Sequence, residues 1–273
     1  MSNAAFNFHE TFAPQIIYLA KLLNLANEQF EGTKFEISNL TGIPTGEHSG
    51  KVVPHVRYLK YMDMIDFALQ NGKYKLSLTE LGKVVYNEDQ YLMQDITKIL
   101  LHYNLTNLKT GAPQWSYLFR EFSYDYNVKV PFTVIEEKAL NKFGKDLELG
   151  PVKTLYTSGD FASISPFELL DNKKSIKFKN SISIFEATNI YAYGLIKDWE
   201  LILHEKNEIT IDEMMLQLKW QKGFSFDYDT MLEVLDEFSM KGFIKLNKQL
   251  NPITLIKDIE STELVSMLYD NLI

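Results

Sequence analysis

Apolar residues recur at helical or strand spacing along most of the chain, and this pattern predicts its main elements. Between Thr11 and Gln29 they are too dense for a surface helix with one narrow stripe. We therefore expect this helix to be buried on two sides, with other units docked against it. Further helices are predicted over 94–104, around 134–143 and over 185–204, and Pro166 opens a predicted helical turn over 166–170.

The segment from Thr33 to Leu76 has the element order of a winged helix-turn-helix. A strand-like entry at 34–37 leads to a short helix that Gly42 ends. After a polar turn, a second helix is predicted over 51–64, starting near Val53 because Pro54 is tolerated only in a first turn. The strand-like segments that follow flank Asn71-Gly72, a strong signal for a two-residue hairpin turn.

A similar order returns towards the C-terminal end of the chain. Ile209-Thr210-Ile211 enters a short predicted helix over 212–218, and a second helix is predicted over 229–240. Two strand-like segments, 243–246 and 253–256, follow. We expect a second winged-helix-like unit here.

The predicted fold class is mainly α with small β-hairpins (α+β). The predicted domains are an N-terminal helix plus winged helix-turn-helix (1–90), a helical linker domain (91–180) and a C-terminal winged-helix-like domain (181–273).

Composition excludes several classes of protein. The 273 residues are 45% hydrophobic and 23% charged, which is ordinary globular usage and excludes a disordered or fibrous chain. With no cysteine, disulfide scaffolds, thiolate zinc sites and cysteine nucleophiles are excluded. Because the sequence has no apolar stretch of membrane-spanning length and no secretory signal, we expect a cytoplasmic protein without membrane contact.

Charge restricts nucleic-acid binding to a local patch. The net charge of −8 argues against a surface that coats nucleic acid. Residues 33–76 carry six bases and four acids, a net charge of +2. In a helix-turn-helix the second helix enters the major groove and the wing contacts the backbone. The predicted DNA-binding residues, taken as exposed, are Lys51, His55, Arg57, Tyr58 and Lys60 on that helix and Lys73 and Lys75 on the wing. The alternative is a winged helix used for protein contacts.

Two further regions have other predicted roles. Residues 208–260 carry six bases and ten acids, a net charge of −4, so a partner-binding or dimerising role fits better than DNA contact. A secondary phosphate contact is considered for four lysines, of which the last two alternate with Ile176 and Phe178 as in a strand. They are Lys173, Lys174, Lys177 and Lys179. A solvated, lysine-protected strand edge is the alternative.

No catalytic residue, metal site or cofactor is predicted. His9-Glu10 offers too few ligands for a metal, and the other histidines show no ligand spacing. We expect Glu10 and Thr11 to cap the first helix while His9 makes a fixed hydrogen bond. Proton transfer by this pair is the enzymatic alternative. The aromatic residues of 115–126 are expected in the core, with base stacking as the alternative. Common phosphate-binding and nucleophile motifs are absent.

Short motifs in order carry a family resemblance. The chain opens with Phe6-Asn7-Phe8-His9-Glu10-Thr11-Phe12, which leads into a helix that carries Lys21. The later motifs are Gly50-Lys51, Val56-Arg57-Tyr58, Thr79-Glu80-Leu81-Gly82, Asp89-Gln90-Tyr91-Leu92, Leu101-His102, and Trp115 with Leu118 and Phe119. Together they resemble the bacterial domain-of-unknown-function (DUF) 4007 family over about residues 6–125. Gln15 and Tyr18 depart from it, because the family usually has Arg and Trp there.

The resemblance implies a setting rather than a reaction. Family members occur in bacterial DNA-modification and phage-defence gene clusters, often beside sulfur-transfer genes, and have no settled enzymatic activity. We therefore predict a non-catalytic DNA-binding or adaptor subunit of such a system. Its expected partners are double-stranded DNA and a protein of the same complex, and a homodimer is left open. The rival hypotheses are an interaction scaffold without DNA contact and an enzyme that uses His9 and Glu10.

Overall fold

A computed structural model describes residues 6, 8–181, 183–249 and 251–272, so Asn7 of the N-terminal motif lies outside the described residues. The first unit contains a helix, a strand, two more helices and a hairpin, followed by a further helix. These elements are α2 (Ile16–Asn27), β1 (Glu31–Thr33), α3 (Lys34–Thr41), α4 (Val52–Tyr61), β2 (Ile65–Gln70), β3 (Lys73–Leu78) and α5 (Glu80–Glu88). The three strands form one antiparallel sheet in the order β1-β3-β2.

Local signals in the sequence fix most of this order. Thr33 and Glu36 form a reciprocal capping box at the start of α3, and Gly42 ends that helix with a φ of 70°. Asn71 and Gly72 both have positive φ, as a tight hairpin turn requires. Two predictions for this unit are corrected: the strand assigned to 34–37 and the first residue of the opening helix. The segment 34–37 is helical and the strand precedes it, while α2 begins at Ile16 rather than Thr11 because Pro14 and the irregular segment before it delay the helix.

The middle of the chain is not purely helical, which corrects the predicted helical linker. Its helical elements are α6 (Asp95–Leu105), α7 (Pro113–Trp115), a π-helical turn η1 (Ser116–Glu121), α8 (Phe132–Phe143), α9 (Gly150–Thr157) and a short 3-10 turn η2 (Ala162–Ile164). A second antiparallel sheet, ordered β4-β6-β5, contains β4 (Lys129–Pro131), β5 (Phe167–Leu170) and β6 (Ser175–Phe178). The predicted helical turn at 166–170 is therefore a strand, because residues 167–170 pair with β6 and bury Phe167.

The C-terminal unit repeats the element order of the first, with one short additional helix, α12, before its second long helix. Its elements are η3 (Phe185–Ala187), α10 (Thr188–Ile202), β7 (Glu208–Thr210), α11 (Ile211–Glu213), a π-helical turn η4 (Met214–Leu218), α12 (Trp220–Gly223), α13 (Tyr228–Met240), β8 (Ile244–Asn247), β9 (Thr254–Lys257) and α14 (Ser261–Val265). Its sheet order is β7-β9-β8. Thr210 and Glu213 form a capping box like that of Thr33 and Glu36, so of the two caps that the sequence allows for this helix, Thr210 and Asp212, the structure has Thr210.

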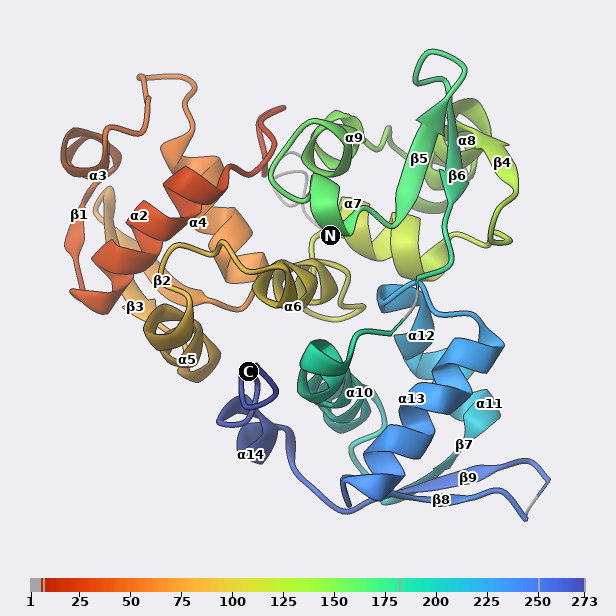
Figure 1. The fold of residues 1–273 in the computed structure, drawn as a ribbon. Helices are drawn as coiled ribbons and strands as arrows, with labels where there is room; N and C mark the ends of the chain where they lie inside the picture. Colours follow the sequence, from red (N-terminus) through yellow and green to blue (C-terminus); the bar gives the residue numbers. More distant parts are fainter. Residues whose placement is uncertain (1–5, 7, 182, 250, 273) are drawn as a thin grey trace.

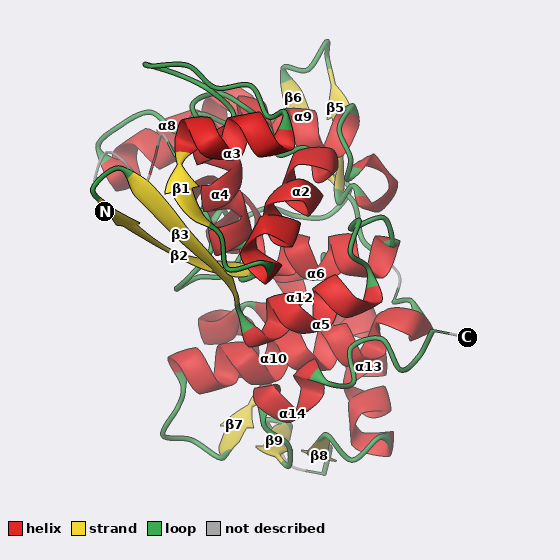
Figure 2. Cartoon of the chain, turned by 90° about the vertical axis from the view of Figure 1, so that its left-hand side faces the viewer, coloured by secondary structure: helices red, strands yellow, loops and turns green. Residues whose placement is uncertain are grey.

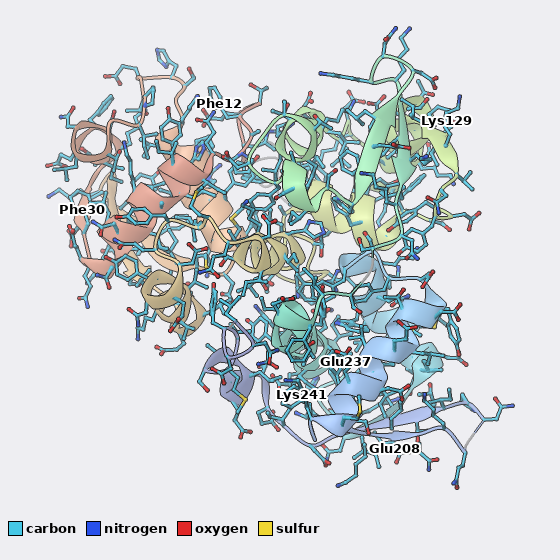
Figure 3. All side chains as sticks on the ribbon, in the orientation of Figure 1. Phe12, Phe30, Lys129, Glu208, Glu237 and Lys241 are labelled. Atoms are coloured by element: carbon cyan, nitrogen blue, oxygen red, sulfur yellow. The ribbon has the colours of Figure 1, made fainter. Side chains whose placement is uncertain are left out.

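The three sheets lie at the periphery, with helices between them (Figure 2). In Figure 1 the first unit, the middle and the C-terminal unit surround α6 and α10, which pack against each other. Figure 3 shows Lys129 at the outer edge of the middle and Glu208, Glu237 and Lys241 in the C-terminal unit. One continuous cluster of buried apolar side chains runs through all three regions. Each unit is therefore held against the others by the core.

Candidate nucleic-acid interface

Helix α4 is anchored by the turn that precedes it. The Lys51 amide donates to the carbonyl of Pro44 at 2.7 Å, and Thr45 and Gly50 form an isolated bridge. Pro54 lies within the first turn of the helix, where its missing N–H costs no internal hydrogen bond. The predicted DNA-binding residues of this helix thus have well-defined positions.

Two of these residues are buried, so the prediction that they are exposed is wrong. His55 and Tyr58 both have 0% exposure. The Gln15 amide donates to Nε2 of His55 at 3.1 Å, and the Tyr58 hydroxyl donates to the Phe12 carbonyl at 2.9 Å. Residues 8–15 therefore cover this side of α4. Burial lowers the pKa of His55 to about 4 and raises the pKa of Tyr58, so both groups are neutral near pH 7.

An aromatic cluster joins this covering segment to the middle of the chain. The ring of Phe8 lies 4.8 Å from that of Tyr58, and Tyr58 lies 5.7 Å from Trp115. Trp115, Tyr117, Phe119 and Phe122 are buried, which confirms that they belong to the core, whereas Tyr124 and Tyr126 are half-buried against it. The rings stabilise the fold and present no free face for base stacking.

His9 and Glu10 hold the N-terminal segment in place. His9 is 1% exposed, its Nδ1 accepts from the Thr11 amide at 3.1 Å, and its Nε2 lies 3.0 Å from the Gln114 amide nitrogen. Burial lowers the pKa of His9. The Glu10 carboxylate accepts from the Gly50 amide at 3.4 Å. The fixed hydrogen bond of His9 is confirmed.

The predicted capping of the first helix by Glu10 and Thr11 is wrong. The Ile16 amide of α2 donates instead to the Asp160 carboxylate at 2.7 Å. This capping group comes from 144 residues further along the chain. No local pattern in the sequence marks such a partner.

The remaining cations of the first unit differ in their surroundings. Lys51 is half-buried, with its ammonium 5.3 Å from the ring centre of Tyr18, and Lys60 forms an ion pair with Asp66. Lys73 and Lys75 are exposed on β3, while the alternate residues of that strand point into the core. The two wing lysines therefore lie side by side on one face, separate from His55 and Tyr58. Arg57, the remaining residue of the predicted DNA-binding set, is half-buried.

The second group of lysines lies on the β5–β6 hairpin. Ile176 and Phe178 are buried, so the predicted strand alternation is confirmed. Lys177 forms an ion pair with Glu168 on the neighbouring strand, whereas Lys173, Lys174 and Lys179 are exposed. Contact of these lysines with phosphate stays a prediction.

Sequence reasoning missed a buried polar network that links the middle to the C-terminal unit. Asp198 of α10 forms an ion pair with Arg120 of η1, and both side chains have 0% exposure. Tyr103 and Asn107 donate to the same carboxylate at 2.5 and 2.7 Å. A carboxylate inside the apolar run of α10 was the one available signal, because a buried charge needs a partner.

Sequence similarity assigns this chain to a family. The model of a family described as a protein of unknown function, DUF4007, matches residues 6–146, just over half of the chain. The chain belongs to the DUF4007 family. No curated protein sequence matches it. The resemblance over residues 6–125 is thus confirmed and extends to residue 146.

The fold of this DUF4007 member resembles that of SspB. A crystal structure of magnesium ion-bound SspB has a TM-score of 0.76 and 15% identity, with 99% of this chain and 91% of that chain covered. A second SspB crystal structure has a TM-score of 0.76 and 16% identity, with 97% and 88% covered. At this identity the likeness concerns the fold, over nearly the whole of both chains.

The described residues offer neither a metal site nor a membrane-spanning helix. They contain no group of three or more His, Asp or Glu side chains arranged to hold a metal ion. Within the same part of the chain, no helix combines the length and the apolar character needed to cross a bilayer.

Proposed function

We propose that this DUF4007 member is an adaptor subunit of a bacterial phage-defence or DNA-modification system that acts by binding and not by catalysis. One observation carries the proposal: the chain contains the same element order twice, with opposite charge. Residues 33–76 have a net charge of +2 and residues 208–260 a net charge of −4. Two similar units of opposite charge suit two different partners.

We interpret the first unit as a winged helix whose wing contacts DNA. The element order and the sheet order β1-β3-β2 support this interpretation. Because residues 8–15 cover one side of α4, we assign the contact to the exposed Lys73 and Lys75 of the wing. Lysines of this kind bind phosphates and carry no direct sequence information. The proposed contact is therefore with the DNA backbone.

We interpret the C-terminal unit as a second winged-helix-like unit that binds a protein. Its acidic residues oppose phosphate contact, and large apolar side chains are exposed on it, with Leu216 at 73% and Met240 at 80%. The partner is an effector of the same system. A second copy of the chain is the alternative partner.

The test is DNA binding by charge-reversal variants of the wing. Lys73→Glu/Lys75→Glu is compared with Lys245→Glu/Lys248→Glu, a matched change in the hairpin of the C-terminal unit. We expect binding of labelled duplex to weaken in the first variant alone. The salt dependence of binding should also fall there, by about one unit of slope per lost phosphate contact.

The rival function is a scaffold that never touches DNA, and the burial of His55 and Tyr58 favours it. Absence of binding to duplex at low salt would establish this rival. Equal affinity of both hairpin variants would also contradict the wing as the DNA contact. Circular dichroism checks that all variants are folded.

A further inference from the structure

The outward face of α2 forms one side of an apolar groove, which we call the α2 groove. Its walls are Leu40 of α3 and the turn that carries Tyr91 and Met93, and its volume is about 630 Å³. In Figure 1 the segment between α5 and α6 passes beside α2. Ile17, Leu40, Tyr91 and Met93 are 61%, 64%, 67% and 65% exposed, which is unusual for four neighbouring large apolar residues.

The walls of the groove are held in a fixed shape. The Asp89 carboxylate accepts from the amides of Met93 and Gln94 at 3.0 and 2.9 Å. Leu92 has a positive φ and is fully buried, so Tyr91 and Met93 on either side of it point outward. The apolar surface is therefore presented by an ordered turn that is anchored in the core.

The shape of the groove suits a helix. Ile17, Ala20, Lys21 and Asn24 lie in one row along α2, at the spacing of helix neighbours, and such a row packs against a second helix. The strands of the described sheets do not line the groove, so an extended peptide would find no strand edge to pair with. A helix satisfies its own backbone hydrogen bonds and needs only apolar contact.

Among the described residues that line the groove, Lys21 is the one cation, and it sets the charge of the occupant. Lys21 donates to the Thr41 carbonyl at 2.6 Å, and among the described residues no carboxylate lies within ion-pair distance of its ammonium. Asp160, at the other end of the row, already accepts from the Ile16 amide. An acidic side chain on the occupant would neutralise Lys21 as the groove is covered.

We propose that the α2 groove docks an amphipathic helix of a partner protein that carries an acidic residue opposite Lys21. The density of apolar residues between Thr11 and Gln29 predicts a helix that is covered on two sides. Within the described chain its outward row is uncovered, and a partner helix completes the packing. This surface lies outside the wing and the C-terminal unit, so the inference does not rest on DNA binding.

The experiment uses the full chain and two labelled model peptides. Both are 18-residue amphipathic helices with leucine at i, i+3, i+4 and i+7, and they differ only in a flanking Glu or Lys. By fluorescence anisotropy we expect the Glu peptide to bind about threefold more tightly than the Lys peptide. Lys21→Glu should reverse this preference, and Ile17→Asp should weaken binding roughly tenfold.

Leu140→Asp is the matched control, since Leu140 is an aliphatic residue 45% exposed on helix α8, away from the groove, the wing and the C-terminal unit. It should leave both affinities unchanged, as should Lys73→Glu/Lys75→Glu. The inference is overturned if neither peptide binds, or if Lys21→Glu does not change the preference. Sedimentation equilibrium identifies the competing occupant. A dimer of the unmodified chain that Ile17→Asp dissociates would mean that a second copy covers the groove.

Discussion

The first unit and the C-terminal unit have similar folds, but the first helix of each unit is covered by other helices to a different extent. In the first unit α2 packs against α3, α4 and α5, and in the second α10 packs against η4, α13 and α14. Helix α10 also packs against α6 and is buried along most of its length. Among the described residues no helix packs over α2 in the way that α6 packs over α10, and Ile17 and Lys21 of α2 are exposed. The first helix of the C-terminal unit is thus covered by the rest of the protein, whereas the first helix of the N-terminal unit is left partly exposed.

The second helices of the two units differ in the opposite sense. Helix α4 is covered by residues 8–15 and buries His55 and Tyr58. Helix α13 exposes Asp229 and Glu233 and is capped by Asp227, whose carboxylate accepts from the Thr230 amide. The helix that a helix-turn-helix would offer to DNA is therefore partly core in the basic unit and negatively charged in the acidic unit. Element order alone does not identify the functional face.

The largest expected effect comes from detaching α10 from the middle of the chain. Asp198→Ala leaves Arg120 buried without its counter-charge, so we expect unfolding to become easier by about 3–5 kcal/mol in urea titrations. Asp236→Ala, which removes an exposed ion pair with Lys248, should cost less than about 1 kcal/mol. Similar losses in both variants would contradict the role of the buried pair.

The next effect concerns how closely α5 approaches the sheet of the first unit. A Cβ at Gly82 would lie 1.9 Å from the Met64 carbonyl oxygen, so the backbone must shift to accommodate alanine. We expect Gly82→Ala to destabilise the protein by about 3 kcal/mol. Gly150→Ala is the control, because its methyl group would meet only the flexible end of the Glu148 side chain. A Gly82→Ala variant as stable as the unmodified protein would show that the backbone near Met64 can move to accommodate a methyl group at little cost.

Acid should weaken the first unit through His55, which has no counterpart on α13. Burial lowers the pKa of His55 from 6.5 to about 4, so the unfolded chain binds the proton first as the pH falls. The contribution to stability is present above pH 6.5 and is lost as the pH falls towards 4. Between pH 7 and pH 5 the loss is about 2 kcal/mol.

Urea titrations at both pH values measure this dependence. His55→Gln should remove the part of the pH dependence that His55 causes. It should leave the part caused by His102, because burial lowers the pKa of His102 to about 3. An unchanged pH dependence in His55→Gln would contradict the assignment.

The smallest expected effect is one that the two units share. Thr33→Ala and Thr210→Ala each remove the threonine of a capping box at the start of the first helix after the strand. We expect about 1 kcal/mol of destabilisation from each, measured by urea denaturation. Equal losses of unfolding free energy would support the two capping boxes as equivalent. A loss in Thr33→Ala alone would show that the two units differ in how much they depend on the capping box.

Much of the fold could be predicted because its signals are local. Gly42, Asn71-Gly72 and Thr210 each specify a helix end, a turn or a cap within a few residues. Segment 166–170 was wrongly predicted because its structure depends on pairing with β6. A proline at its start is compatible with either a helix or a strand.

The candidate site was harder to predict because exposure is not a local property. His55 and Tyr58 have the polarity of groove-reading residues, but they are covered by a segment whose bonding residues lie 40 and 46 positions earlier in the chain. Lys73 and Lys75 were correctly placed outward because strand alternation around the buried Tyr74 decides their direction. The buried partners Arg120 and Asp198 lie 78 residues apart, and no spacing rule connects them.

The bond between Ile16 and Asp160 has a consequence for synthesis of the chain. During translation, residues 16–78 leave the ribosome well before Asp160 exists. At roughly 5–20 residues per second, the delay is on the order of 10 seconds. Throughout that interval only water can hydrogen-bond the Ile16 amide at the start of α2. The first unit therefore acquires this capping bond only after the middle of the chain has emerged and folded against it.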